Sequence, residues 1–171
     1  MADGIALEGL RRGWGAIERA VHHGEDLDAR LQMLCASSMG AMAFQKGLGC
    51  VHSLSHAIGG LHPRAHHGTL NAVFLPAVLR FNASHPSMQA EDKLPRLAQA
   101  MGMADAAPEA LAEALRQRTQ DLALPTRLSG MGLDLSDSGL IIERALKDHC
   151  HGTNPREASV EDYERLLEAC A

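Results

Sequence analysis

The sequence predicts an all-α fold, a multi-helix bundle around one hydrophobic core. Hydrophobic residues make up 46% of the 171-residue chain, which is enough to build a sizeable core without disulfides. Aromatic residues make up only 3%, and this scarcity, with abundant Ala, Leu, Met and Gly, favours closely packed helices over β-sheets. Apolar residues also recur at steps of three and four along much of the chain, which is the period of an amphipathic helix.

The first two predicted helices occupy the N-terminal quarter of the chain. An apolar stripe over residues 5–21 predicts the first helix, which ends before Gly24. Asp26 or Asp28 can cap the second helix, over residues 29–44. Because residues 29–44 are apolar on nearly every face, we expect this helix to be central and buried.

Glycines delimit a short third helix. It follows Gly47 and Gly49, carries His52 and His56, and is expected to end at Gly59–Gly60. The two histidines are four residues apart, so the helix places them on one face.

The remaining two thirds of the chain predict further helices joined by short loops. The expected helices are residues 68–82, with Pro76 kinking the helix or resetting its first turn; residues 89–101; residues 108–122, with Pro108 in the first turn; residues 137–149; and a last helix beginning at Ser159 or Val160. The expected turns and loops are residues 124–128, 130–138 and 152–156. No linker is long enough to divide the chain, so we expect residues 1–171 to form a single helical domain.

Charge and hydropathy exclude several classes of partner. The chain has 16 basic and 21 acidic side chains and a net charge of -5, which gives no basic surface for nucleic acid or an anionic membrane. Every apolar run is shorter than the roughly 20 residues that span a bilayer. The N-terminus lacks a basic segment followed by an apolar one, so we expect a cytoplasmic protein.

The four cysteines, Cys35, Cys50, Cys150 and Cys170, form no CxxC pair, so we expect free and mostly buried thiols. His149, Cys150 and His151 have the side chains of metal ligands. Neighbouring residues on a helix point in different directions, however, and this geometry disfavours a joint ligand role.

Histidines provide the main chemical signal. Ten are present, and half of them lie in one segment: His52, His56, His62, His66 and His67. His52 and His56 share a helical face, and His67 lies at an expected helix start, where its side chain can turn toward the same pocket. Two or three imidazoles suit Zn, Fe, Ni or Cu and leave coordination positions open, as a catalytic site requires. The alternative is a packed His pair with solvent-exposed loop histidines.

Several catalytic motifs are missing. The residues between His52 and His56 are Ser53, Leu54 and Ser55, so the metalloprotease motif HExxH does not occur. The sequence also contains no GxSxG, no GxxxxGK[ST] and no GxGxxG. These absences argue against a metalloprotease, a serine hydrolase and a nucleotide-binding domain.

Five segments of the sequence form a specific pattern: 42–44 (MAF), 47–60 (GLGCVHSLSHAIGG), 67–76 (HGTLNAVFLP), 124–128 (LPTRL) and 153–156 (TNPR). These segments resemble one enzyme family, the group III iron-containing alcohol dehydrogenases. They occur in the family's order and extend over essentially the whole chain. The resemblance implies the helical C-terminal domain of dehydroquinate synthase-like and iron-containing alcohol dehydrogenases.

The resemblance also implies roles for three histidines. In this family a dinucleotide-binding N-terminal half packs against the helical half, and a divalent metal (Fe or Zn) lies between them, bound by one Asp and three His. By position in the motif, His52 and His67 would be metal ligands. His56 would be the catalytic residue, lying near the nicotinamide of NAD(P) and serving in positioning or proton relay.

This sequence departs from the family pattern in three ways. The family's Asp-x3-His ligands and its dinucleotide-binding domain would both precede Ile5, so we expect both to be absent from the chain. The segment from His56 to His67 is one residue longer than usual and has His66 in place of a Pro. Either His66 or His67 could therefore be the ligand, and the following Gly68 favours His67.

These departures imply weak or no metal binding by the isolated chain, and NAD(P) binding only with the missing domain. Asp148, His149 and His151 are the only other ligand candidates by residue type.

Three functional hypotheses follow. The first is the C-terminal part of an oxidoreductase, alcohol dehydrogenase-like or maleylacetate reductase-like, that is inactive alone and pairs with a separate dinucleotide-binding domain. The second is a free-standing helical metal-binding or interaction module, a homo-oligomer whose exposed inter-domain face is covered by self-association. The third is an inert remnant that folds.

Overall fold

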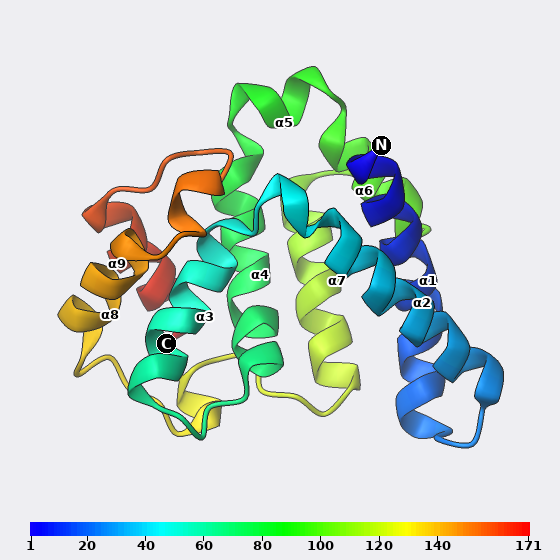
Figure 1. Ribbon diagram of the computed structural model, residues 1–171, viewed down its shortest axis with the longest axis horizontal. Coiled ribbons are helices and arrows are strands. Elements are labelled where there is room, and N and C mark those ends of the chain that lie inside the picture. The colour runs from blue at the N-terminus through cyan, green and yellow to red at the C-terminus, as the bar shows by residue number, and fades with distance from the viewer.

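The computed structural model describes residues 1–171 and contains nine α-helices and three short 3₁₀ helices (Figure 1). In chain order the α-helices are α1 (Ala2–His22), α2 (Leu27–Ala43), α3 (Gly49–Leu61), α4 (His67–Ala83), α5 (Pro86–Ala90), α6 (Lys93–Ala100), α7 (Pro108–Asp121), α8 (Ser138–Lys147) and α9 (Val160–Cys170). The 3₁₀ helices are Phe44–Lys46, Ser129–Met131 and His151–Thr153. The chain contains no β-strand, so the all-α prediction is confirmed.

Helix α4 is the central element of the bundle. It packs against α3, α7 and α9, and α8 covers α3 from the far side (Figure 1). The main core joins α3, α4, α8 and α9 through fully buried side chains that include Leu54, Ile58, Phe74, Ile141 and Tyr163. A smaller cluster around Ala98, Met101 and Leu111 joins α6 and α7 to Leu10 and Trp14 of α1.

The expectation that residues 29–44 form the central, buried helix is wrong. Helix α2 packs antiparallel against α1 at one edge of the molecule, and of its residues only Ala29 is buried (Figure 1). Leu31 and Leu34 remain 56% and 67% exposed. A helix that is apolar on all faces buries only the face that meets a neighbour, and within this chain α2 has only α1 to cover it.

Three expected helix boundaries need correction. The helix expected at residues 89–101 is two helices, α5 and α6, because Asp92 adopts a left-handed backbone conformation with φ 48°. Helix α3 continues through Gly59–Gly60 to Leu61, since a helix tolerates interior glycines at about 1 kcal/mol each. The helix expected at residues 137–149 ends at Lys147, and Asp148 is extended.

The other expected elements occur close to their expected positions. Asp26 caps α2 by accepting from the Ala29 N–H, and Pro108 lies in the first turn of α7. Ser159 caps α9 in a reciprocal capping box with Asp162. Helix α4 runs on through Pro76, so this proline does not reset the first turn.

The burial of the cysteines and the length of the helices can be compared with the sequence predictions. All four cysteines are free, and Cys50, Cys150 and Cys170 are buried, as expected. None of the helices has the combined length and apolarity of a bilayer-spanning segment.

Helix α3 receives its N-terminal cap from a distant part of the chain. Thr153 Oγ1 accepts hydrogen bonds from the N–H groups of Leu48 and Gly49 at 3.2 and 3.4 Å, and Asn154 Oδ1 accepts from the Cys50 N–H at 3.1 Å. No side chain near Leu48 performs this role. The distant cap therefore satisfies amide groups that a helix start leaves without partners.

The close approach of this cap explains two glycines. Gly47 and Gly49 have φ values of 97° and 70°, in the region that favours glycine. A Cβ atom on Gly47 would overlap the Thr153 side chain, and one on Gly49 would lie 2.6 Å from Asn154 Oδ1.

Asn154 also links this cap to α4. Its Nδ2 donates to Asn82 Oδ1 at 2.7 Å and to the Arg156 carbonyl at 2.6 Å. One half-buried amide thus holds the start of α3, the end of α4 and the segment leading to α9.

We predict that Asn154→Ala lowers the free energy of unfolding by about 2 kcal/mol, because it removes a helix cap and leaves several polar groups unpaired. Urea denaturation followed by circular dichroism measures this change. Gln120→Ala, at an exposed position of α7, is the control and should change stability by less than about 0.5 kcal/mol. Equal stability of the two variants would contradict the role given to Asn154.

Candidate functional site

Helix α3 holds His52 and His56 on its outer face because its inner face is fixed in the core. Ser53, between them, is fully buried, and its hydroxyl lies 2.7 Å from the Tyr163 hydroxyl. Tyr163 OH is also 3.0 Å from His151 Nδ1. These polar contacts set the rotation of α3, so that both histidines point away from the core.

Three predicted site histidines converge on this face. The ring centroid of His52 lies 5.7 Å from that of His56 and 5.3 Å from that of His67. His56 and His67 stack nearly parallel, with centroids 5.4 Å apart. The structure therefore brings together residues of α3 and of the first turn of α4.

His66 differs from these three histidines in position and in role. It is the N-cap of α4, and its Nδ1 accepts a hydrogen bond from the Thr69 N–H at 3.2 Å. This bond turns the His66 ring toward its own helix, whereas the neighbouring His67 ring joins His52 and His56. Of the two alternatives left by the sequence, His67 is thus the one that faces the cluster. His62 lies at the C-cap of α3, 3.9 Å from Asp137.

Asn71 lies between His52 and His67. Its Nδ2 is 3.4 Å from His52 Nε2 and 3.1 Å from His67 Nε2, so both nitrogens approach one point. His52 Nδ1 and Asn71 Oδ1 are buried and have no hydrogen-bond partner. Convergent imidazole nitrogens with unsatisfied polar atoms beside them suit a divalent metal such as Fe or Zn. The sequence reasoning missed Asn71, although its place one turn after His67 is a usable signal.

The surroundings of His52 and His67 favour the neutral form of both imidazoles. Burial and the nearby His67 and His56 hold the pKa of His52 below its ordinary value of 6.5. Burial and the nearby His56 and His66 likewise lower the pKa of His67. A neutral imidazole is the form that binds metal.

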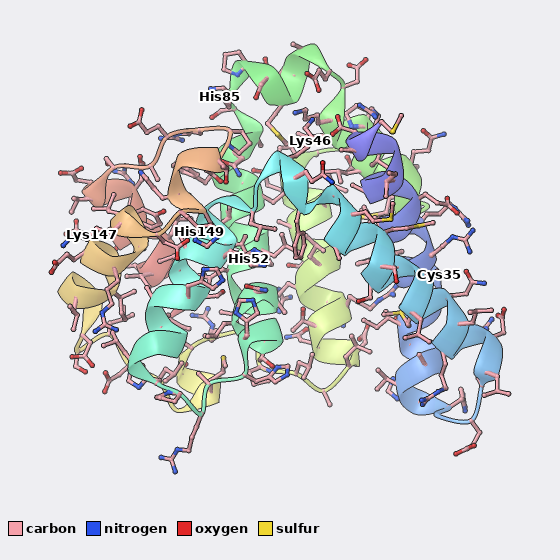
Figure 2. The ribbon with its side chains drawn as sticks, viewed as in Figure 1. Cys35, Lys46, His52, His85, Lys147 and His149 are labelled. Atoms are coloured by element: carbon pink, nitrogen blue, oxygen red, sulfur yellow. The ribbon has the colours of Figure 1, made fainter.

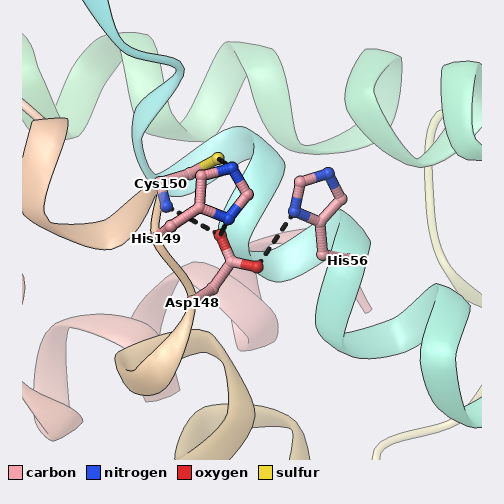
Figure 3. Close-up of side chains that lie close together, drawn as sticks. All are labelled: His56, Asp148, His149 and Cys150. Carbon is pink, nitrogen blue, oxygen red and sulfur yellow. Dashed lines mark hydrogen bonds and ion pairs between the residues drawn. The ribbon is translucent and has the colours of Figure 1, made fainter.

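Asp148 orients the ring of His56. His56 Nδ1 lies 3.0 Å from Asp148 Oδ2, and because a carboxylate only accepts, His56 carries its proton on Nδ1 (Figure 3). The Cys150 N–H donates to Asp148 Oδ1 at 2.8 Å. Burial acts to raise the pKa of Asp148, but these hydrogen bonds outweigh it and the pKa is lowered.

Residues 148–150 lie beside His56, in an arrangement that helix geometry did not predict. The His149 ring stacks on His56 with centroids 5.8 Å apart, and His149 and His52 lie on the same face of the molecule (Figure 2). The thiol of Cys150 is buried, and burial raises its pKa to about 11. The argument from helix geometry fails here because α8 has already ended at Lys147. His151 is not part of this group and contacts Tyr163.

Comparison with known proteins decides the family. Residues 1–171 match the family model described as Fe-containing alcohol dehydrogenase family, C-terminal. The chain belongs to the iron-containing alcohol dehydrogenase family. It is 57% identical over 171 residues to the 4-hydroxybutyrate dehydrogenase of Cupriavidus necator and 30% identical over 174 residues to the NAD-dependent methanol dehydrogenase of Bacillus methanolicus. Each alignment covers 98% of this chain and 44% of the relative.

Solved structures of the family have the same fold. The alcohol dehydrogenase from Oenococcus oeni superposes with a TM-score of 0.91 at 28% identity, and a 1,3-propanediol oxidoreductase with 0.89 at 30% identity. Each superposition covers 99% of this chain and 45% of the other. The chain thus spans less than half the length of the relatives it matches, and it corresponds to their C-terminal helical domain.

We predict that the metal-free chain loses stability as the pH falls below 6.5. Since His52 and His67 have lowered pKa values when folded, the unfolded state binds more protons below that pH, and protonation favours unfolding. Urea denaturation with a chelator, at about pH 7.5 and about pH 5.5, measures the effect. His52→Gln/His67→Gln should reduce the difference between the two pH values; an unchanged difference would contradict this origin.

Proposed function

We propose that this chain supplies the metal-binding half of a divalent-metal, NAD(P)-linked alcohol dehydrogenase, acting on an alcohol or its aldehyde. The observation that carries this proposal is the convergence of His52, His56 and His67 on one face, in the order that the family motif requires. The remaining metal ligands and the dinucleotide site would come from a preceding domain or a separate polypeptide. The chain alone would then be a single helical domain with weak metal affinity and no catalytic cycle.

In this proposal His52 and His67 bind the metal, and His56 takes part in proton transfer. When bound, the metal supplies Lewis acidity that lowers the pKa of an alcohol oxygen, and NAD(P) supplies the hydride acceptor. His56, with its Nδ1 proton held by Asp148, presents the lone pair of Nε2 and can accept a proton there. Asp148 is a positioning residue, because it fixes the tautomer and the ring orientation of His56.

A chimera tests this function directly. The chain would replace the C-terminal 44% of the Cupriavidus necator 4-hydroxybutyrate dehydrogenase, its 57%-identical relative, and alcohol-dependent reduction of NAD(P) would be assayed with 4-hydroxybutyrate. We expect an active, metal-containing enzyme. His52→Ala and His67→Ala should lose both metal and activity, whereas His56→Ala should keep the metal and lose activity by about 100-fold or more.

Gln120→Ala in the same chimera controls for folding and should retain both metal and activity. A chimera that folds and binds NAD(P) but neither binds metal nor oxidises the alcohol would overturn the proposed function. Elemental mass spectrometry of each variant reports metal per chain independently of activity.

A second function, a free-standing oligomeric module, has one observation in its favour. Leu27, Leu31 and Leu34 lie along one side of α2 and are 78%, 56% and 67% exposed, an apolar surface that a soluble monomer rarely leaves open. This proposal predicts a dimer or larger species in sedimentation equilibrium, and a monomer for Leu31→Gln/Leu34→Gln. A wild-type chain that sediments as a monomer would exclude it.

A further inference from the structure

Four potential ligand atoms meet beside the histidine cluster but outside the His52–His67 pair. They come from His56 on α3 and from Asp148, His149 and Cys150, which follow α8, and all four lie within 4.8 Å of one another (Figure 3). We infer that these four side chains form a second metal site, selective for zinc and distinct from the pair formed by His52 and His67. It shares no ligand with that pair, but it uses His56 and Asp148, so zinc bound there would block the proton transfer proposed for His56.

To bind zinc, the four ligand atoms need to move only slightly closer together. Bonds of about 2.0 to 2.3 Å in a tetrahedral zinc site place ligand atoms roughly 3.3 to 3.8 Å apart, so the widest pair here must close by about 1 Å. His149 can supply this movement because its side chain is 81% exposed and packs in no core. Asp148 and Cys150 are already held in place by the hydrogen bond from the Cys150 N–H to Asp148 Oδ1 at 2.8 Å.

The existing contacts also align the ligands. Cys150 Sγ lies 3.4 Å from His149 Nε2, and His56 Nδ1 lies 3.0 Å from Asp148 Oδ2. Both contacts join atoms that would face a common ion, which would replace the protons that these contacts now share. Binding would release the thiol proton of Cys150, and the proton of neutral His56 would move from Nδ1 to Nε2.

The donor set selects the metal. One thiolate, two imidazoles and one carboxylate are the nitrogen, sulfur and oxygen ligands that tetrahedral zinc takes, and they are unsuited to Mg²⁺ or Ca²⁺. The carboxylate and the thiolate together carry two negative charges, which balance the charge of the ion. The His52–His67 pair offers no sulfur, so ligation by sulfur distinguishes the two sites.

Cobalt(II) added to the metal-free 171-residue chain tests the inference, because a Co²⁺–thiolate bond gives an intense near-ultraviolet charge-transfer band. We expect this band in the wild type and in His52→Ala/His67→Ala, and its bleaching by one equivalent of Zn²⁺. His149→Ala, an exposed substitution that leaves the core intact, should weaken cobalt binding by about tenfold or more. Cys150→Ser should abolish the band, with circular dichroism confirming the fold.

Cys35→Ser is the matched control, since Cys35 is a free, half-buried thiol away from this group, and the band should persist in it. A wild-type chain without the band, or a band that survives Cys150→Ser or keeps its full affinity in His149→Ala, overturns the second site. A cobalt signal without thiolate character that disappears in His52→Ala/His67→Ala also overturns it, while leaving the proposed function intact.

Discussion

The geometry of the candidate site depends on the cap that Thr153 and Asn154 place on the start of α3. This helix carries two of the clustered histidines, yet its own N-terminal residues offer no capping side chain. The cap sets where α3 begins, and the hydrogen bonds between Asn154 and Asn82 connect that point to the end of α4. His67 lies at the opposite end of α4, so its position beside His52 and His56 follows from the packing of α3 against α4, which the cap anchors at one end.

A second constraint, the buried contact between Ser53 and Tyr163, determines which face of α3 is presented. Ser53 is directed inward, and between Cys50 and Ile58 only His52 and His56 are partly exposed. Asp148 then meets His56 from the turn after α8, so the cluster has contributions from three elements. The candidate site therefore lies where two helix ends meet one face of α3, above the buried core.

Local sequence patterns predicted the class of fold and most helices, because caps, glycines and apolar spacing act over a few residues. Asp26, Pro108 and Ser159 each occupy the position that its chemistry suggests. Burial of α2 was predicted wrongly, since periodicity cannot tell how many neighbours a helix has. In the candidate site the pairing of His52 with His56 was readable from spacing. The contact of Asp148 with His56 was not, because 92 residues separate them and nothing local encodes it.

The distance along the chain between the cap and its helix has a consequence for biosynthesis. Cys50 and Asn154 are 104 positions apart, so during translation α3 leaves the ribosome long before its capping residues are made. Contacts of such large sequence separation form late, after the loop-closure entropy has been overcome. The histidine face would thus become ordered only after Thr153 and Asn154 have been made, although His52, His56 and His67 leave the ribosome much earlier.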